Sequence, residues 1–127
     1  MYNTPPTFAI WVANLVCKWL ISEGGVEVMD RRARERSSLV YQTIDASGGF
    51  YVNNIPAQHR SRMNVVFTLA ESALTDLFIK EADAQGLKNL RGHRSVGGLR
   101  ASLFNAMPMA GAEKLSQFMK DFAERHG

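Results

Sequence analysis

The polar residues best suited to chemistry lie in the glycine-rich segment 92–98 and just after it. His93 and Arg94 stand between glycines, and Arg100 follows Arg94 by six residues. Glycines let backbone N–H groups approach an anion and let the chain bend at low steric cost. Guanidinium groups bind phosphate or carboxylate through forked hydrogen bonds. The pattern indicates an anion site, although a surface loop with two solvated arginines explains it about as well.

Two other places offer weaker anion contacts. Asn3 and Thr4 could present an amide and a hydroxyl to an oxyanion, but prolines follow them, and capping of a helix start explains Thr4 more simply. Arg60 and Arg62 stand just ahead of a strand pattern. Arginines in such positions are more often exposed or ion-paired than ligand-binding.

The patterns of several common active sites are missing from the sequence. His59, His93 and His126 lack the spacing of metal ligands, so we expect no metal site. No glycine fingerprint for dinucleotides or nucleoside triphosphates occurs, and no serine sits in a nucleophile elbow. The carboxylates are scattered without a visible acid–base pair. We therefore name no catalytic residue in this chain.

Charge and cysteine content narrow the partners and the compartment. The net charge is +3, and the arginine-rich run 30–36 is mixed with acidic residues, which favours a solvated helix face over a nucleic-acid surface. The apolar stretch 8–21 is shorter than the roughly 20 residues that span a membrane, and Lys18 interrupts it. Cys17 is the single cysteine, and its apolar neighbours predict a core thiol in a reducing compartment. We expect a cytoplasmic protein that binds neither nucleic acid nor membrane.

Hydrophobic periodicity predicts the elements that position these residues. The first helix, starting at a Thr4 cap, is apolar nearly all round and should be buried on most sides. Alternation of apolar and polar residues makes 62–69 the clearest strand. The expected elements, in order, are helices over 4–21 and 26–44, strands over 50–52 and 62–69, a helix from a Ser72 cap to Gly86, strands over 87–91 and 99–104, and a helix over 111–125. This order predicts an α/β fold, locally α+β, with helices packed on a small sheet.

Four stretches resemble phosphoserine aminotransferases, in this order and at this spacing. They are MYNTPPTF at 1–8, RSRMNV at 60–65, GHRSVGGLRAS at 92–102 and NAMP at 105–108. The likeness covers essentially the whole chain. The family comprises homodimeric, pyridoxal 5′-phosphate-dependent enzymes of the aspartate-aminotransferase fold (fold type I), with active sites shared across the dimer. They transfer an amino group between L-glutamate and 3-phosphohydroxypyruvate, giving 2-oxoglutarate and O-phospho-L-serine for serine biosynthesis and, in bacteria, for pyridoxine biosynthesis.

The resemblance also implies roles for individual residues. Asn3 and Thr4 match the pair that contacts the cofactor phosphate of the neighbouring subunit. His93 and Arg94 match the pair that holds the substrate phosphate across the dimer, and Arg100 matches the arginine that binds the substrate carboxylate. The implied organisation has three parts: residues 1–24 as the tail of the large cofactor-binding domain, 25–46 as a linking helix, and 47–127 as the small C-terminal domain.

The residues that carry out amine transfer in the family are missing from this chain. The Schiff-base lysine, the aspartate on the pyridine nitrogen and the ring-stacking aromatic belong, in the family, to a region before the residue that matches Met1. The chain's own lysines fall in predicted helices or on a polar turn. We therefore expect a fragment that is inactive alone. Two alternatives stay open: a stand-alone module that binds phosphate or carboxylate without catalysis, and a structural fragment whose arginines bind nothing.

Overall fold

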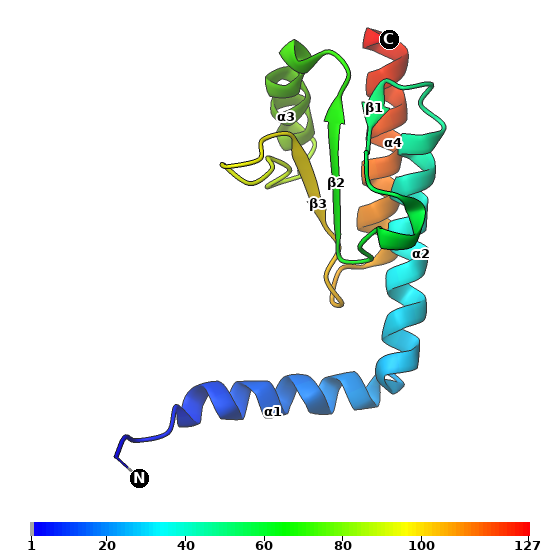
Figure 1. The fold of residues 1–127 in the computed structure, drawn as a ribbon. Helices are drawn as coiled ribbons and strands as arrows, with labels where there is room; N and C mark the ends of the chain where they lie inside the picture. Colours follow the sequence, from blue (N-terminus) through cyan, green and yellow to red (C-terminus); the bar gives the residue numbers. More distant parts are fainter. Residues whose placement is uncertain (1) are drawn as a thin grey trace. The chain divides into compact units, whose positions relative to one another are not determined.

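The computed structural model describes residues 2–127, so Met1, the first residue of the stretch at 1–8, lies outside it. The chain forms two compact units, one ending at Arg32 and the other running from Ala33 to Gly127. The boundary falls inside the second helix. The elements, labelled in Figure 1, are α1 (Thr7–Ser22), α2 (Gly25–Asp45), β1 (Tyr51–Val52), η1 (Ala57–His59), β2 (Asn64–Leu69), η2 (Ser72–Leu74), α3 (Thr75–Ala84), β3 (Leu99–Ser102) and α4 (Met109–His126).

The first unit contains α1, which begins later than the sequence pattern indicates. Pro6 occupies the N-cap position without a side-chain hydrogen bond, so the prediction that Thr4 caps this helix is wrong. Proline has no backbone N–H, and the first donor of the helix is therefore Thr7, which bonds the Pro5 carbonyl at 2.8 Å. The helix ends at Ser22, and Gly24, two residues further on, has a φ of +103°, the left-handed conformation that favours glycine.

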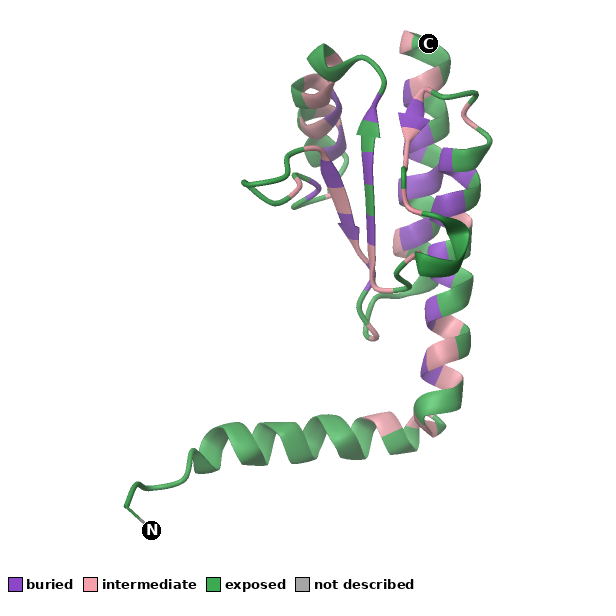
Figure 2. Cartoon of the chain, in the orientation of Figure 1, coloured by how far each residue is buried: buried purple, intermediate pink, exposed green. Residues whose placement is uncertain are grey.

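Helix α1 is exposed along almost its whole length, as its colour in Figure 2 shows. No residue of α1 is buried, Trp11 keeps 56% of its surface exposed, and Cys17 is an exposed free thiol. The predictions of a mostly buried helix and of a core thiol are therefore wrong for this chain. Both predictions failed for one physical reason. The sequence pattern indicates how apolar a helix is, but a helix is buried only when a second layer packs against it, and this unit has no second layer.

The second unit contains an antiparallel three-stranded sheet in the order β1-β2-β3. The expected strands over 50–52, 62–69 and 99–104 are confirmed in shortened form. In β2, Val65, Phe67 and Leu69 are buried while the residues between them face outward. The expected strand over 87–91 is wrong, because only an isolated bridge pairs Arg91 with Leu99.

Three helices supply the other side of the core. Helix α3 begins at Thr75, after a 3-10 turn over Ser72–Leu74, so Ser72 does not cap it as predicted. Helix α4 begins at Met109, two residues before the predicted start. Figure 1 shows α4 and the C-terminal part of α2 side by side, next to β1. Helix α3 lies on the other side, next to β2 and β3. The α/β architecture, locally α+β, is confirmed.

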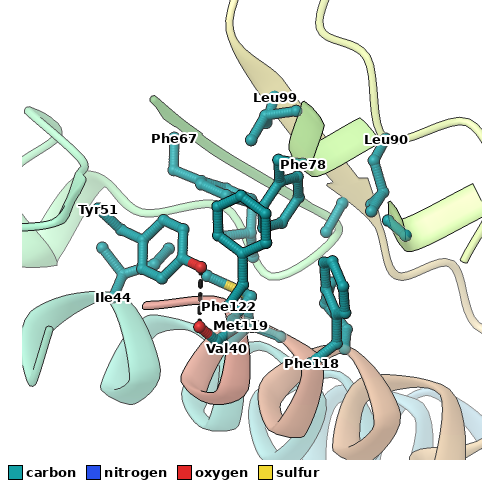
Figure 3. Close-up of a cluster of buried hydrophobic side chains, with 14 of the residues drawn as sticks. Val40, Ile44, Tyr51, Phe67, Phe78, Leu90, Leu99, Phe118, Met119 and Phe122 are labelled. Atoms are coloured by element: carbon teal, nitrogen blue, oxygen red, sulfur yellow. Dashed lines mark hydrogen bonds between the residues drawn. The ribbon is translucent and has the colours of Figure 1, made fainter. Parts of the chain in front are cut away.

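Aromatic rings fill the centre of this core, as Figure 3 shows. Phe78 is fully buried and lies within 5.0 Å, centroid to centroid, of both Phe118 and Phe122. Edge-to-face contacts of this kind add to the free energy gained by burying the rings. The Tyr51 hydroxyl donates a 2.8 Å hydrogen bond to the Met119 carbonyl, and burial raises the pKa of Tyr51 well above its usual value. The core thus joins β1, β2 and the helices α3 and α4 into one body.

Arg60 is held by a structural ion pair. Its guanidinium donates to both carboxylate oxygens of Asp45, at 2.6 and 2.7 Å, and stacks 4.7 Å from the centre of the Tyr41 ring. The Tyr41 hydroxyl in turn donates to the Ser61 carbonyl at 3.0 Å. The ion-paired interpretation of Arg60 therefore fits better than an anion contact, and the pair fastens the segment before β2 to α2.

This ion pair should make stability depend on pH at the acidic end. The hydrogen bond from Arg60 lowers the pKa of Asp45 in the folded chain, so its stabilisation is present above the unfolded pKa and is lost as the pH falls through the folded value. We expect Asp45→Asn to lower the free energy of unfolding by less than about 1 kcal/mol at neutral pH, because the carboxylate is half exposed. The difference should begin to shrink below about pH 4 and should vanish only when the pH is below the lowered pKa of Asp45 in the folded chain.

Urea unfolding at a series of pH values measures this difference. Asp83→Asn is the matched control, since its pair with Lys88 is longer, at 3.8 Å, and exposed on both sides. A deficit in Asp45→Asn that persists undiminished at the acidic end would show that the carboxylate acts through something other than its charge.

Candidate functional site

One hollow on the outer face of the sheet is lined by two of the polar residues singled out in the sequence, His93 and Arg100. Its volume is about 370 Å³. The residues that line it are Val52, Asn53, Asn54, Ile55, Val66, Phe67, Thr68, Gly92, His93, Val96, Gly97, Leu99 and Arg100. The hollow therefore joins the strand edges, the turn after β1 and the glycine-rich loop before β3.

The register of β2 and β3 places Arg100 in this hollow. Arg100 pairs with Val66, and its neighbours Leu99 and Ala101 are buried in the core. Because side chains alternate along a strand, Arg100 must project from the opposite face. Its backbone N–H donates to the Leu90 carbonyl at 2.8 Å, which ties the strand to the preceding segment.

The guanidinium of Arg100 has an unmet hydrogen-bonding requirement. Its Nε is out of contact with solvent and has no hydrogen-bond partner within residues 2–127. A buried donor without a partner costs about 1–3 kcal/mol. An anion that enters the hollow could accept from this nitrogen, and the arginine would then gain a charge-assisted hydrogen bond.

Glycines close the loop 92–98 into a tight hairpin. The Gly92 N–H donates to the Gly98 carbonyl at 2.8 Å, and the Val96 and Gly97 N–H groups both donate to the His93 carbonyl, at 2.9 and 2.8 Å. A Cβ at Gly92 would collide with the Gly97 carbonyl oxygen. Gly97 and Gly98 have φ values of +78° and +65°, the left-handed region where glycine carries no steric penalty. The composition of this loop is thus explained by its backbone geometry.

The two polar residues at the start of the loop occupy different positions. His93 lines the hollow, and its Nδ1 lies 2.7 Å from the Ser95 hydroxyl and accepts the Ser95 N–H at 3.3 Å. Arg94 is exposed on the turn, next to His93 but outside the lining. The structure therefore brings His93 and Arg100 to one hollow, whereas Arg94 is not among the residues that line it.

Asn3 and Thr4 belong to the other unit. Both are exposed and precede α1, where their side chains are accessible to a ligand. An amide and a hydroxyl in this state can donate hydrogen bonds to phosphate oxygens.

Asn53 is a residue of the hollow that the sequence reasoning missed. Its side-chain amide donates to the Val66 carbonyl at 2.6 Å, and its Oδ1 accepts the Ile55 N–H at 3.1 Å. The second bond is an Asx turn, for which an asparagine two residues before Ile55 and three before Pro56 is a recognisable signal. That signal predicts a turn. It does not tell that the turn faces Arg100, because this depends on the pairing of β1 with β2.

The lining of the hollow suits binding more than catalysis. It contains neither a carboxylate nor a lysine; its charged or titratable side chains are Arg100 and His93. Over the described residues no group of His, Cys, Asp and Glu side chains could hold a metal ion. Among the same residues, no helix is long and apolar enough to cross a membrane.

Because Arg100 and His93 are its charged or titratable side chains, the hollow can bind an anion. The apolar side chains of Val66 and Ile55, which also line it, can contact the carbon chain of that anion.

Gly92→Ala tests whether backbone packing dictates the loop. The added Cβ meets a carbonyl oxygen that belongs to the backbone and cannot rotate away, so we expect the hairpin to open and stability to fall by about 1–3 kcal/mol. Amide hydrogen exchange should show loss of protection at residues 92 and 97. Val96→Ala, at an exposed position of the same loop, is the control and should leave both amides protected. Unchanged protection in Gly92→Ala would disprove the close approach.

Comparison with known proteins identifies the family. The chain is 54% identical to a phosphoserine aminotransferase of Acidithiobacillus ferrooxidans and 51% identical to one of Chromobacterium violaceum, over 100% of its own length and 35% of theirs. It therefore spans about a third of these curated relatives. A solved phosphoserine aminotransferase from Bacillus circulans superposes with a TM-score of 0.94 at 46% identity, over 99% of this chain and 35% of that one.

A second solved structure, phosphoserine aminotransferase from Trichomonas vaginalis with bound pyridoxal phosphate, has a TM-score of 0.86 at 42% identity and covers 94% of this chain and 34% of that one. The family model for class-V aminotransferases matches residues 1–115, nearly the whole chain. The chain belongs to the class-V aminotransferase family.

Proposed function

We propose that this chain is the part of a phosphoserine aminotransferase that binds the anionic groups of the substrate. His93 and Arg94 would hold the phosphate, and Arg100 the carboxylate. The observation that carries this proposal is the hollow in which Arg100 Nε, buried and without a hydrogen-bond partner, shares a wall with His93 and faces no carboxylate. Relatives of this name cover the whole chain at more than 50% identity.

The reaction to which these residues contribute is the exchange of an amino group between L-glutamate and 3-phosphohydroxypyruvate. Pyridoxal 5′-phosphate supplies the electron sink for such chemistry when it is bound. Two residues of this chain fit its phosphate, because Asn3 and Thr4 expose an amide and a hydroxyl. The hollow around Arg100 has no lysine or carboxylate suited to the cofactor's ring, and this chain would bind and orient the substrate.

Each substrate group calls for different chemistry from the site. A phosphate offers several oxygens and prefers point donors around it, which the imidazole N–H of His93 and the guanidinium of Arg94 can supply. A carboxylate is planar and matches the fork of a single guanidinium, that of Arg100. Two anionic ends held at separate points fix the substrate in one orientation, with its reacting carbon between them.

The relation to the full enzyme follows the resemblance. We propose that residues 1–24 belong to the large cofactor-binding domain, 25–46 to a linking helix and 47–127 to the small domain, and that the enzyme is a homodimer whose subunits share their active sites. Its place would be the cytoplasm, in serine and pyridoxine biosynthesis. The large domain would cover the apolar side chains of α1, none of which is buried in this chain.

A stand-alone module that binds anions without catalysis is the weaker candidate. The hollow alone would serve either role. The likeness to aminotransferases, however, extends over α1 and α2 as well as the hollow, and a separate binding module has no use for a helix with an uncovered apolar surface.

Titration of O-phospho-L-serine into the chain tests the proposed binding site. We expect saturable binding in the millimolar range or tighter, weakened about tenfold or more by Arg100→Ala, since a charge-assisted hydrogen bond contributes about 1.5–3 kcal/mol. Arg94→Ala should weaken phosphoserine binding but leave the weaker binding of L-serine unchanged.

The matched control for this titration is Arg91→Ala. Arg91 lies just before the loop and is paired with Asp76 at 2.7 Å on the surface, outside the lining of the hollow. Binding that is equally strong in Arg91→Ala and Arg100→Ala would contradict the proposal, as would the absence of saturable binding by the unsubstituted chain.

Borohydride reduction tests the prediction that the chain is inactive alone. Its lysines lie on exposed helix faces or beside Asp83, and none lines the hollow; they are Lys18, Lys80, Lys88, Lys114 and Lys120. After incubation with pyridoxal 5′-phosphate and reduction, we expect low, scattered labelling by mass spectrometry. A stoichiometric pyridoxyl adduct at one lysine would show that the chain holds the cofactor by itself.

A further inference from the structure

The imidazole of His93 is held by the residue two positions further along the loop. The backbone N–H of Ser95 donates to His93 Nδ1 at 3.3 Å, and the Ser95 hydroxyl oxygen lies 2.7 Å from the same nitrogen. A nitrogen that accepts a backbone N–H must carry its lone pair on that side, so the ring proton is assigned to Nε2. With Nδ1 as the acceptor, the Ser95 hydroxyl is the second donor to it.

The remaining freedom of His93 is small once these contacts are made. Its carbonyl accepts the N–H groups of Val96 and Gly97, which fixes the backbone of the loop at this point. The side chain still has two torsions, and the contacts with Ser95 restrain both by fixing the position of Nδ1. On the far side of the ring, Nε2 has no hydrogen-bond partner in the part of the chain that the structure describes.

We propose that Ser95 is a positioning residue, which holds His93 in its Nε2–H tautomer and thereby presents one fixed N–H donor to a phosphate oxygen of the ligand. The identity of the ligand in this inference rests on the proposed function of the hollow, whereas the contact between Ser95 and His93 does not. Within residues 2–127, Ser95 is the residue that makes hydrogen bonds with this ring.

The tautomer matters because phosphate oxygens are acceptors at neutral pH. A neutral imidazole with its proton on Nε2 donates to such an oxygen through the free side of the ring. The other tautomer would turn a lone pair toward the anion, and the two would repel each other. Whether the imidazole attracts or repels the phosphate thus depends on which ring nitrogen accepts the hydrogen bonds of Ser95.

Nitrogen-15 spectroscopy of the histidine rings reads this tautomer directly. The chain has His59, His93 and His126, and His93→Gln identifies the signals in question. At about pH 9, where an imidazole is neutral, we expect His93 to show an unprotonated Nδ1 and a protonated Nε2. Ser95→Ala should shift both nitrogen signals toward the average of two exchanging tautomers, and Ser95→Thr should restore the pattern because it keeps the hydroxyl.

Val96→Ala is the matched control, since Val96 is the next residue of the turn and its side chain is exposed. Its ring spectrum should equal that of the unsubstituted chain. A His93 that already averages between tautomers in the unsubstituted chain would overturn the proposal, and so would a Ser95→Ala spectrum that does not change.

Titration with inorganic phosphate measures whether Ser95 affects ligand binding. Followed by the His93 Nε2 signal, phosphate affinity should fall about twofold to tenfold in Ser95→Ala, the range of one neutral hydrogen bond, and recover in Ser95→Thr. If Arg94→Ala leaves phosphate binding unchanged, the proposed function of the loop fails while the spectrum still decides the tautomer. An unchanged phosphate affinity in Ser95→Ala, with Arg94→Ala weakened, would refute the positioning role alone.

Discussion

The pairing of β2 with β3 is the constraint on which the candidate site depends. Phe67 and Leu99 are opposite each other and both face the core, and this register sets Val66 opposite Arg100 on the outer face. A slip of one residue would turn Arg100 into an aromatic core and Leu99 into water, which is costly for a charge and for an apolar side chain alike. The free energy of burying the core therefore also holds the arginine in the hollow.

The loop before β3 extends this constraint to the histidine. Gly98 lies so close to the Phe67 carbonyl that a Cβ there would come within 3.0 Å of it, and Gly92 closes the other end against the Gly97 carbonyl. The loop is thus packed on β2 and on itself. His93 inherits its position from these backbone contacts, and Ser95 sets the orientation of the ring. The sheet and the glycine hairpin together fix His93 and Arg100, the two groups that we propose bind anions, in one hollow.

Sequence reasoning could predict what depends on local pattern. The alternation in 64–69 and the glycine turns that follow α1 and α3 depend on residue type and spacing, as does the prediction, still to be tested, that Arg100 binds an anion. Burial of α1 and of Cys17 could not be predicted, because it depends on what covers the helix. The prediction of a strand at 87–91 was wrong because, within this segment, only Arg91 forms a β-bridge, with Leu99. Asn53 was missed because its place in the same hollow as Arg100 arises only from pairing between strands that are distant in the sequence.

The central claim is that the hollow around Arg100 binds an anion through that guanidinium. The most direct measurement is the Nε–H resonance of Arg100 in nitrogen-15 spectra of the chain, assigned through Arg100→Lys, during titration with O-phospho-L-serine. The account predicts that this signal shifts and exchanges more slowly with water as the ligand saturates, while that of Arg91 stays unchanged. Saturable binding of O-phospho-L-serine without any shift of the Arg100 signal would contradict this claim.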